Sequence, residues 1–152
     1  MDYKIEMKEV SAQPVLAVHF RSSVEELPDQ LGRIYGNIIG YIQKANGTNP
    51  VVPYAAYFNL DMKDLDLEAG FTVTEAIAGE GEIYAGEIAA GKQVSCTHKG
   101  PYAASEKAYN EMTEWMQKNN CIPTGAAYEF YLNSPEEVPE SELLTKIVFP
   151  LK

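Results

Sequence analysis

Glu129 is the residue whose surroundings most favour chemistry, because it lies among aromatic residues in Tyr128-Glu129-Phe130-Tyr131. The pattern of residues 128–132 predicts a strand, in which successive side chains point to opposite faces. Glu129 and Tyr131 then share one face, and Tyr128 and Phe130 share the other. A carboxylate on a buried, tyrosine-lined face either takes up a proton or binds a cationic partner, because an unpaired buried charge is costly. The alternative is a solvated glutamate on the exposed face of an edge strand.

Other reactive residues form weaker sets. Ser95, Cys96 and His98 are close in sequence, but neighbouring positions of one strand do not form a catalytic triad, and the chain has no G-x-S-x-G motif. His19 and His98 have no further ligands at metal-binding spacing, and Cys96 and Cys121 form no C-x-x-C pair. We therefore expect no metal and no cofactor.

The elements that position Glu129 follow from hydrophobic periodicity. Apolar residues at helical spacing predict two amphipathic helices, at about 28–45 and 103–119. Alternating and β-branched segments predict strands at 10–20 (interrupted by Pro14), 55–60, 71–77, 82–88, 93–97, 128–132 and 143–149. Pro50 and Pro53 indicate a loop, and residues 61–68 are expected to form a polar connection.

The sequence contains an internal repeat with an offset of 74 residues. Tyr35 recurs as Tyr109 and Tyr57 as Tyr131, and four further identities have the same offset: Gln43 with Gln117, Lys44 with Lys118, Asn46 with Asn120 and Asn59 with Asn133. Glu129 breaks the symmetry, because its counterpart is Ala55.

This repeat predicts an α+β fold with two pseudo-symmetric β-α-β-β half-domains packed around a central ligand groove. The half-repeats are expected at about 1–78 and 82–152, within one domain that spans residues 1–152. Ligand sites favour junctions of this kind.

The acidic composition argues against direct nucleic-acid binding. Twelve Lys and Arg against 22 Asp and Glu give a net charge of −10, whereas phosphate contacts are made by basic side chains. The ten tyrosines suit a half-wet pocket as well as the edges of a sheet. An acidic cleft lined by aromatic rings would attract a lipophilic cation.

The chain shows neither a signal peptide nor a membrane-spanning stretch, so we expect a cytoplasmic protein without membrane contact. Cys96 and Cys121 are expected to be reduced thiols, since a small secreted domain usually carries more cysteines. A disulfide between them is the alternative.

Short motifs that together cover nearly the whole chain support these expectations. They are Tyr57–Asp61, Asp66–Gly70, Thr97–Tyr102, Tyr109, Trp115, Glu129–Pro135 and Leu144–Thr145. In this order and spacing they resemble the GyrI-like small-molecule-binding domain family, also known as the effector-binding domain of multidrug-responsive transcription activators.

The resemblance implies two β-α-β-β units around a groove, with Glu129 facing the groove and contacting cationic, often aromatic, ligands. It also implies that Tyr131, Trp115, Tyr57 and Tyr102 stack on those ligands. Many relatives carry a helix-turn-helix DNA-binding domain in the same chain. Since this sequence begins with the effector domain itself, we expect a stand-alone member.

Three functions follow as hypotheses. The first is a stand-alone binder of lipophilic cationic or aromatic small molecules. The alternative is a hydrolase of toxic electrophilic compounds, with Glu129 as general base and Tyr131 as acid or hydrogen-bond donor. The third is an acidic inhibitor or partner of another protein such as DNA gyrase, suggested by members of the family that bind gyrase and by the charge of −10.

Overall fold

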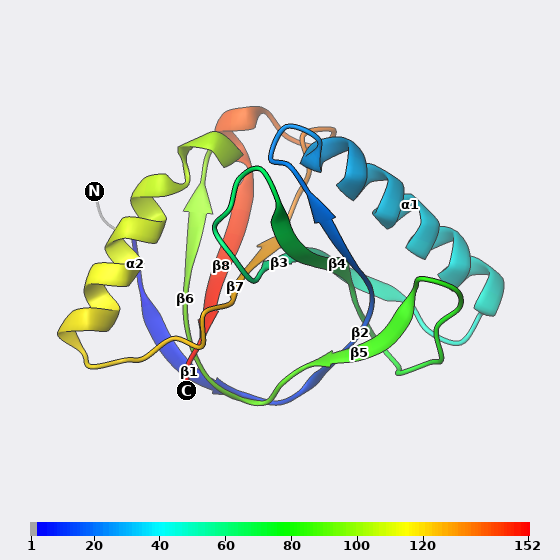
Figure 1. Ribbon diagram of the computed structural model, residues 1–152, viewed down its shortest axis with the longest axis horizontal. Helices are drawn as coiled ribbons and strands as arrows, with labels where there is room; N and C mark the ends of the chain where they lie inside the picture. The colour runs from blue at the N-terminus through cyan, green and yellow to red at the C-terminus, as the bar shows by residue number, and fades with distance from the viewer. Residues whose placement is uncertain (1–2) are drawn as a thin grey trace. The chain divides into compact units, whose positions relative to one another are not determined.

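The computed structural model describes residues 3–152, which form two compact units of sheet and helix (Figure 1). We call residues 11–90 the N-unit, and residues 91–152 together with the first strand the C-unit. The N-unit contains β2 (Gln13–Ser22), α1 (Leu27–Ala45), β3 (Pro50–Tyr57), β4 (Leu65–Val73) and β5 (Tyr84–Ile88). The C-unit contains β1 (Glu6–Val10), β6 (Gly91–Lys99), the 3-10 turn η1 (Tyr102–Ala104), α2 (Glu106–Lys118), β7 (Ala127–Tyr131), the 3-10 turn η2 (Glu140–Glu142) and β8 (Leu144–Pro150).

Both units have the same antiparallel strand order. It is β5-β2-β4-β3 in the N-unit and β1-β6-β8-β7 in the C-unit. Each unit therefore contains a β-α-β-β core, β2-α1-β3-β4 or β6-α2-β7-β8, extended by one edge strand. The predicted α+β class with two β-α-β-β halves is confirmed.

The edge strands make the units differ from the expected half-repeats of 1–78 and 82–152. β1 comes first in the chain but pairs with β6, with Glu6 opposite Ser95. β5 follows the midpoint of the chain but pairs with β2, with Ile88 opposite Gln13. Each unit thus contains an edge strand that the half-repeats would assign to the other half, and the compact units divide after residues 10 and 90.

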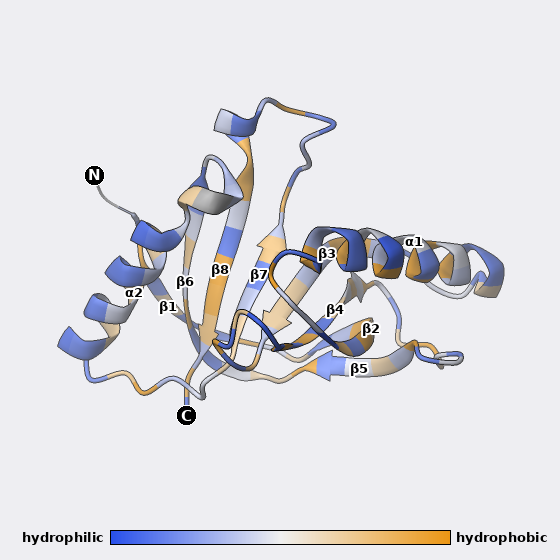
Figure 2. Cartoon of the chain, turned by 45° about the horizontal axis from the view of Figure 1, so that its top comes forward, coloured by the Kyte–Doolittle hydropathy of each residue, from blue (hydrophilic) through white to orange (hydrophobic). Residues whose placement is uncertain are grey.

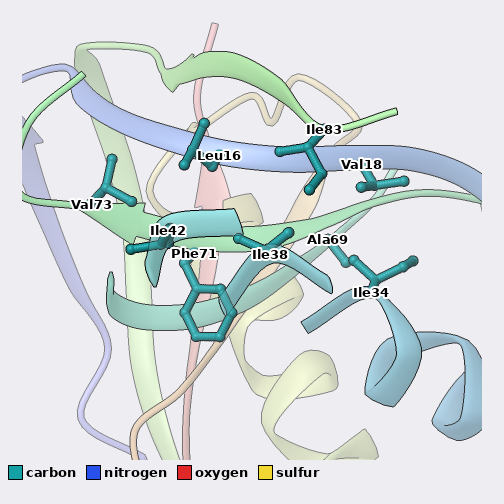
Figure 3. Close-up of a cluster of buried hydrophobic side chains, with 9 residues drawn as sticks. All are labelled: Leu16, Val18, Ile34, Ile38, Ile42, Ala69, Phe71, Val73 and Ile83. Carbon is teal, nitrogen blue, oxygen red and sulfur yellow. The ribbon is translucent and has the colours of Figure 1, made fainter. Parts of the chain in front are cut away.

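The core of the N-unit lies between α1 and the sheet. Ile34, Ile38 and Ile42 form the buried stripe of the helix, as the periodicity predicts. They pack against buried side chains of the strands and of the β4–β5 connection (Figure 3), namely Leu16, Val18, Ala69, Phe71, Val73 and Ile83. Figure 2 shows polar and apolar residues alternating around α1. The helix ends at Asn46, whose left-handed conformation (φ 57°) lets its N–H donate to the Ile42 carbonyl at 3.0 Å.

The core of the C-unit has the same construction. Ala108, Met112 and Met116 of α2 pack on buried residues of β6 and β8, namely Val94, Cys96 and Ile147. Cys96 is buried and Cys121 half-buried, and both are free thiols, so the disulfide alternative is wrong. Burial raises the pKa of Cys96 to about 11.

Two predicted connections are strands in the structure. Pro50 and Pro53 lie within β3, which accommodates them because its register with β4 shifts between these two residues. β4 begins at Leu65, inside the expected polar connection, because Leu65 and Leu67 are buried while Asp66 between them faces the other side. The expected strand 71–77 accordingly ends at residue 73.

The internal repeat is visible in matched aromatic contacts. Tyr35 of α1 packs edge-on against Phe71 of β4, with ring centroids 5.4 Å apart. Tyr109 of α2 packs edge-on against Phe149 of β8, at 5.7 Å. The repeated tyrosines therefore anchor each helix to the corresponding strand.

Matched asparagines brace the turns that follow β3 and β7. Asn59 Oδ1 accepts the Asp66 N–H at 2.9 Å, and Asn133 Oδ1 accepts the Leu144 N–H at 2.9 Å. The segment from Asn133 to Leu144 is four residues longer than its counterpart in the N-unit. The additional length forms a proline-containing loop that has no equivalent in the N-unit. Neither helix of the described residues has the length and apolar character needed to cross a membrane.

Candidate functional site

Glu129 lies on the face of its sheet that α2 covers. It stands opposite Ile147 of β8, a buried member of the core beneath α2, and directly opposed residues share a face. All of β7 is half-buried. Glu129 thus belongs to the layer between sheet and helix.

Two phenols hold the carboxylate of Glu129. The hydroxyl of Tyr109 donates to Oε2, and the hydroxyl of Tyr131 donates to Oε1 at 2.9 Å. The second bond confirms the prediction from strand parity that Glu129 and Tyr131 share a face. A carboxylate accepts about four hydrogen bonds, so these two donors fix its orientation and leave acceptor positions for a further partner.

Tyr109 is a site residue whose role the sequence did not reveal. The sequence identified it as the repeat counterpart of Tyr35 and as one of the family motifs, and assigned it no contact with Glu129. A useful signal was available, because a tyrosine on a helix face that covers a strand carboxylate has a hydroxyl able to reach it.

Tyr102 extends the site outward from Tyr131. The two rings meet edge to face, with centroids 5.5 Å apart and an interplanar angle of 68°. Tyr102 is 43% exposed. Partial burial raises the pKa of its phenol, and the negative charge of Glu129 raises it further.

Trp115 and Tyr57, the other two expected site residues, have packing roles. Trp115 is half-buried and lies against the core of the C-unit. Tyr57 belongs to the N-unit, where it packs against the cluster of Leu27, Leu65 and Leu67. Within the C-unit, the structure brings together Glu129, Tyr131 and Tyr102 from the predicted set and adds Tyr109.

The N-unit contains a second carboxylate held by two phenols. Tyr54 donates to Glu68 Oε2 at 2.6 Å, and Tyr84 donates to Oε1. The sequence did not point to Glu68, because residues 61–68 have the composition of a polar connection. The alternation of apolar Leu67 and Ala69 with polar neighbours is the signal that could have placed Glu68 within a strand.

The chain is thus an α+β protein of two repeated units, with a half-buried carboxylate set among tyrosines in one of them. The family model described as "GyrI-like small molecule binding domain" matches residues 1–152, and the chain therefore belongs to this family. The resemblance noted in the sequence is thus confirmed. No curated protein matches the chain.

Solved structures share the fold at low sequence identity. The C-terminal domain of EcmrR superimposes with a TM-score of 0.83 at 23% identity, covering 100% of this chain and 99% of that domain. In a complex of EcmrR with DNA, the score is 0.85 at 24% identity, and the match covers 99% of this chain but 57% of the EcmrR chain. The present chain therefore spans little more than half the length of EcmrR.

Two further structures share the fold at still lower identity. A hydrolase from Listeria innocua gives a TM-score of 0.73 at 15% identity, with coverage of 98% of this chain and 92% of that one. SAV2435, solved with bound tetraphenylphosphonium, gives 0.64 at 12% identity, with coverage of 100% and 94%. At these identities the likeness establishes the fold.

Proposed function

We propose that this domain binds lipophilic cations, with the carboxylate of Glu129 as counter-charge and the rings of Tyr131 and Tyr102 as stacking surfaces. The observation that carries the proposal is the half-buried carboxylate, oriented by Tyr109 and Tyr131 and continued toward solvent by Tyr102.

The chemistry of the site suits a large, weakly hydrated cation. Such an ion loses little hydration on leaving water, and it gains attraction both from a carboxylate and from the faces of aromatic rings within about 6 Å. Because Tyr109 and Tyr131 already hold the carboxylate in place, the ligand does not have to order it. Tetraphenylphosphonium, bound by the structural neighbour SAV2435, is a cation of this kind.

Replacement of Glu129 by Gln tests the proposal, because it removes the charge while keeping the shape. We expect the affinity for tetraphenylphosphonium to fall by about tenfold or more, the equivalent of ~1.4 kcal/mol. The affinity for triphenylphosphine oxide, a neutral compound of related shape, should stay unchanged. Isothermal titration calorimetry measures both.

Glu68→Gln is the matched control, because it removes the same charge from the other carboxylate held by two phenols. It should leave tetraphenylphosphonium binding intact. If both variants lose the cation equally, or if Glu129→Gln weakens the cation and the neutral compound alike, specific charge recognition by Glu129 is wrong.

Hydrolysis is a second candidate, favoured by the distance of 2.9 Å between the Tyr131 hydroxyl and Glu129 Oε1. An acid and a base within hydrogen-bonding reach could act on one electrophile, with Glu129 accepting a proton from water and Tyr131 donating one to the leaving group. The shared fold with a Listeria hydrolase supports this alternative. Mass spectrometry of reactive esters after incubation separates the two functions. Products that the wild-type chain forms and Glu129→Gln does not form favour the hydrolase. Compounds that stay unchanged but bind with measurable affinity favour the binder.

A further inference from the structure

The C-unit contains an open cavity beside Tyr102. Its volume is about 470 Å³, and it is lined by Tyr102, Pro135, Val138, Pro139, Glu140 and Leu143. This volume lies within the range of small-molecule sites, roughly 300–1,000 Å³. The lining is largely apolar, and Glu140 is exposed to solvent.

The wall of the cavity is the loop that makes the C-unit different from the N-unit. Pro135–Leu143 belongs to the segment that is four residues longer than its repeat counterpart. The loop is held at its C-terminal end, since Leu143 is buried, with 1% exposure, and its carbonyl accepts the Gly100 N–H at 2.8 Å. Asn133 Nδ2 also donates to the Glu142 carbonyl at 3.1 Å. The cavity is therefore part of the folded structure.

Tyr102, the lining residue that lies outside this loop, follows a proline whose carbonyl is bound by a buried histidine. His98 is 3% exposed, and its Nε2 lies 3.0 Å from the carbonyl oxygen of Pro101, the residue before Tyr102. Its Nδ1 lies 3.0 Å from the Tyr3 hydroxyl. Because the Pro101 carbonyl can only accept, Nε2 carries the proton and donates to it. These bonds fix the start of η1 and with it the position of the Tyr102 backbone.

Tyr102 is shared between the cavity and the Glu129 site. It lines the cavity and meets Tyr131 edge to face at 5.5 Å, and Tyr131 in turn donates to Glu129. Two aromatic rings thus lead from the carboxylate to the cavity. A ligand whose charge rests beside Glu129 can reach the cavity with an arm that passes along these rings.

We propose that the Tyr102 cavity is a second subsite, which receives the neutral aromatic arm of an amphipathic cation whose charge is bound at Glu129. Prolines, Val138 and Leu143 offer the arm apolar contact, and Tyr102 offers edge or face stacking. The preferred ligands are then monocations with an aryl group on a linker, ahead of compact cations of equal charge. This inference rests on the proposed function of Glu129.

Two probes with the same cationic head test the subsite. Tetramethylammonium has the head alone, and (4-phenylbutyl)trimethylammonium adds an aryl arm. We expect the wild-type chain to bind the arm-bearing cation at least about tenfold more tightly. Val138→Trp, which fills the cavity, should remove most of that preference and leave tetramethylammonium binding unchanged. Val51→Trp, at an exposed valine of β3 in the N-unit, is the matched control and should keep the preference.

The outcomes separate the two proposals. If Val138→Trp retains the wild-type preference, or if Val51→Trp abolishes it equally, the subsite is wrong while the function of Glu129 stands. If Glu129→Gln leaves the affinity for both cations unchanged, the proposed function itself fails. A measurement on the wild-type chain covers the case in which Val138→Trp does not fold. The methyl NMR signals of Val138 should shift with the arm-bearing cation and stay in place with tetramethylammonium, and equal behaviour with both probes would overturn the subsite.

Discussion

The tyrosines at equivalent positions of the two helices, Tyr35 and Tyr109, have different hydrogen-bond partners. In the N-unit, the hydroxyl of Tyr35 donates to the backbone carbonyl of Tyr54 at 2.8 Å. In the C-unit, the hydroxyl of its counterpart, Tyr109, donates to the side chain of Glu129. Ala55 occupies the position of Glu129 in the N-unit, so no carboxylate is present there to receive the phenol. The tyrosine hydroxyl thus joins helix to strand in the N-unit, whereas in the C-unit it orients the carboxylate of Glu129.

The two carboxylates held by phenols are not copies of each other. Glu129 shares a face with Ile147 beneath α2. Glu68 adjoins Ala69, which packs beneath α1, and strand alternation places Glu68 on the face away from the helix. The repeat therefore accounts for the scaffold, whereas the two carboxylates occupy different positions in it.

The largest effect is expected from placing a carboxylate at position 55, the N-unit counterpart of Glu129. Ala55 is fully buried (0% exposed) beneath α1, so Ala55→Glu places a charge among the buried apolar side chains of that core. We expect the free energy of unfolding to fall by about 3 kcal/mol or more, measured by urea denaturation. Ala55→Gln, which is similar in size but neutral, should cost less. Equal losses would show that volume, rather than charge, distinguishes the two positions.

Removing the hydroxyl of Tyr35 or of Tyr109 tests whether these two tyrosines have different roles. Tyr35→Phe leaves the Tyr54 carbonyl without this donor and should cost about 1–3 kcal/mol of stability, with cation binding unchanged. Tyr109→Phe should instead weaken tetraphenylphosphonium binding by roughly threefold to tenfold, because Glu129 loses one of its two orienting donors. Thermal denaturation and calorimetry on both variants check the pair. A reversed pattern would mean that Tyr35, not Tyr109, serves the ligand site.

The smallest expected effect concerns the titration of Tyr102. The raised pKa of its phenol means that the folded state resists ionisation, so a small part of the stability present below pH 10 is lost as the pH rises through that pKa. Glu129→Gln should lower the pKa of Tyr102, because it removes a nearby negative charge. Ultraviolet difference titration, with Tyr102→Phe identifying the signal, measures the shift. An unchanged pKa would indicate that Tyr102 and Glu129 are not electrostatically coupled.

Local patterns predicted much of this molecule. The helical spacing of Ile34, Ile38 and Ile42 identified the buried face of α1, and strand parity placed Glu129 and Tyr131 together. In each case the information lies within a few residues, where the geometry of helix or strand fixes which side chains share a face.

The features that escaped prediction depend on distant pairing. The exchange of edge strands requires knowing that β1 pairs with β6 and β5 with β2, which no local pattern states. The bond from Tyr109 to Glu129 joins α2 to β7, and the cavity depends on a loop closed by Leu143 and Gly100. Glu68 was missed for a different reason: its strand begins in a segment whose acidic composition resembles that of a loop.

The most direct test of the central claim is to locate the bound cation. A crystal structure of the chain with tetraphenylarsonium would reveal the arsenic by its anomalous scattering. We predict a peak within about 6 Å of the Glu129 carboxylate, with phenyl groups against Tyr131 and Tyr102. A peak beside Glu68, or a bound cation remote from Glu129, would contradict the account.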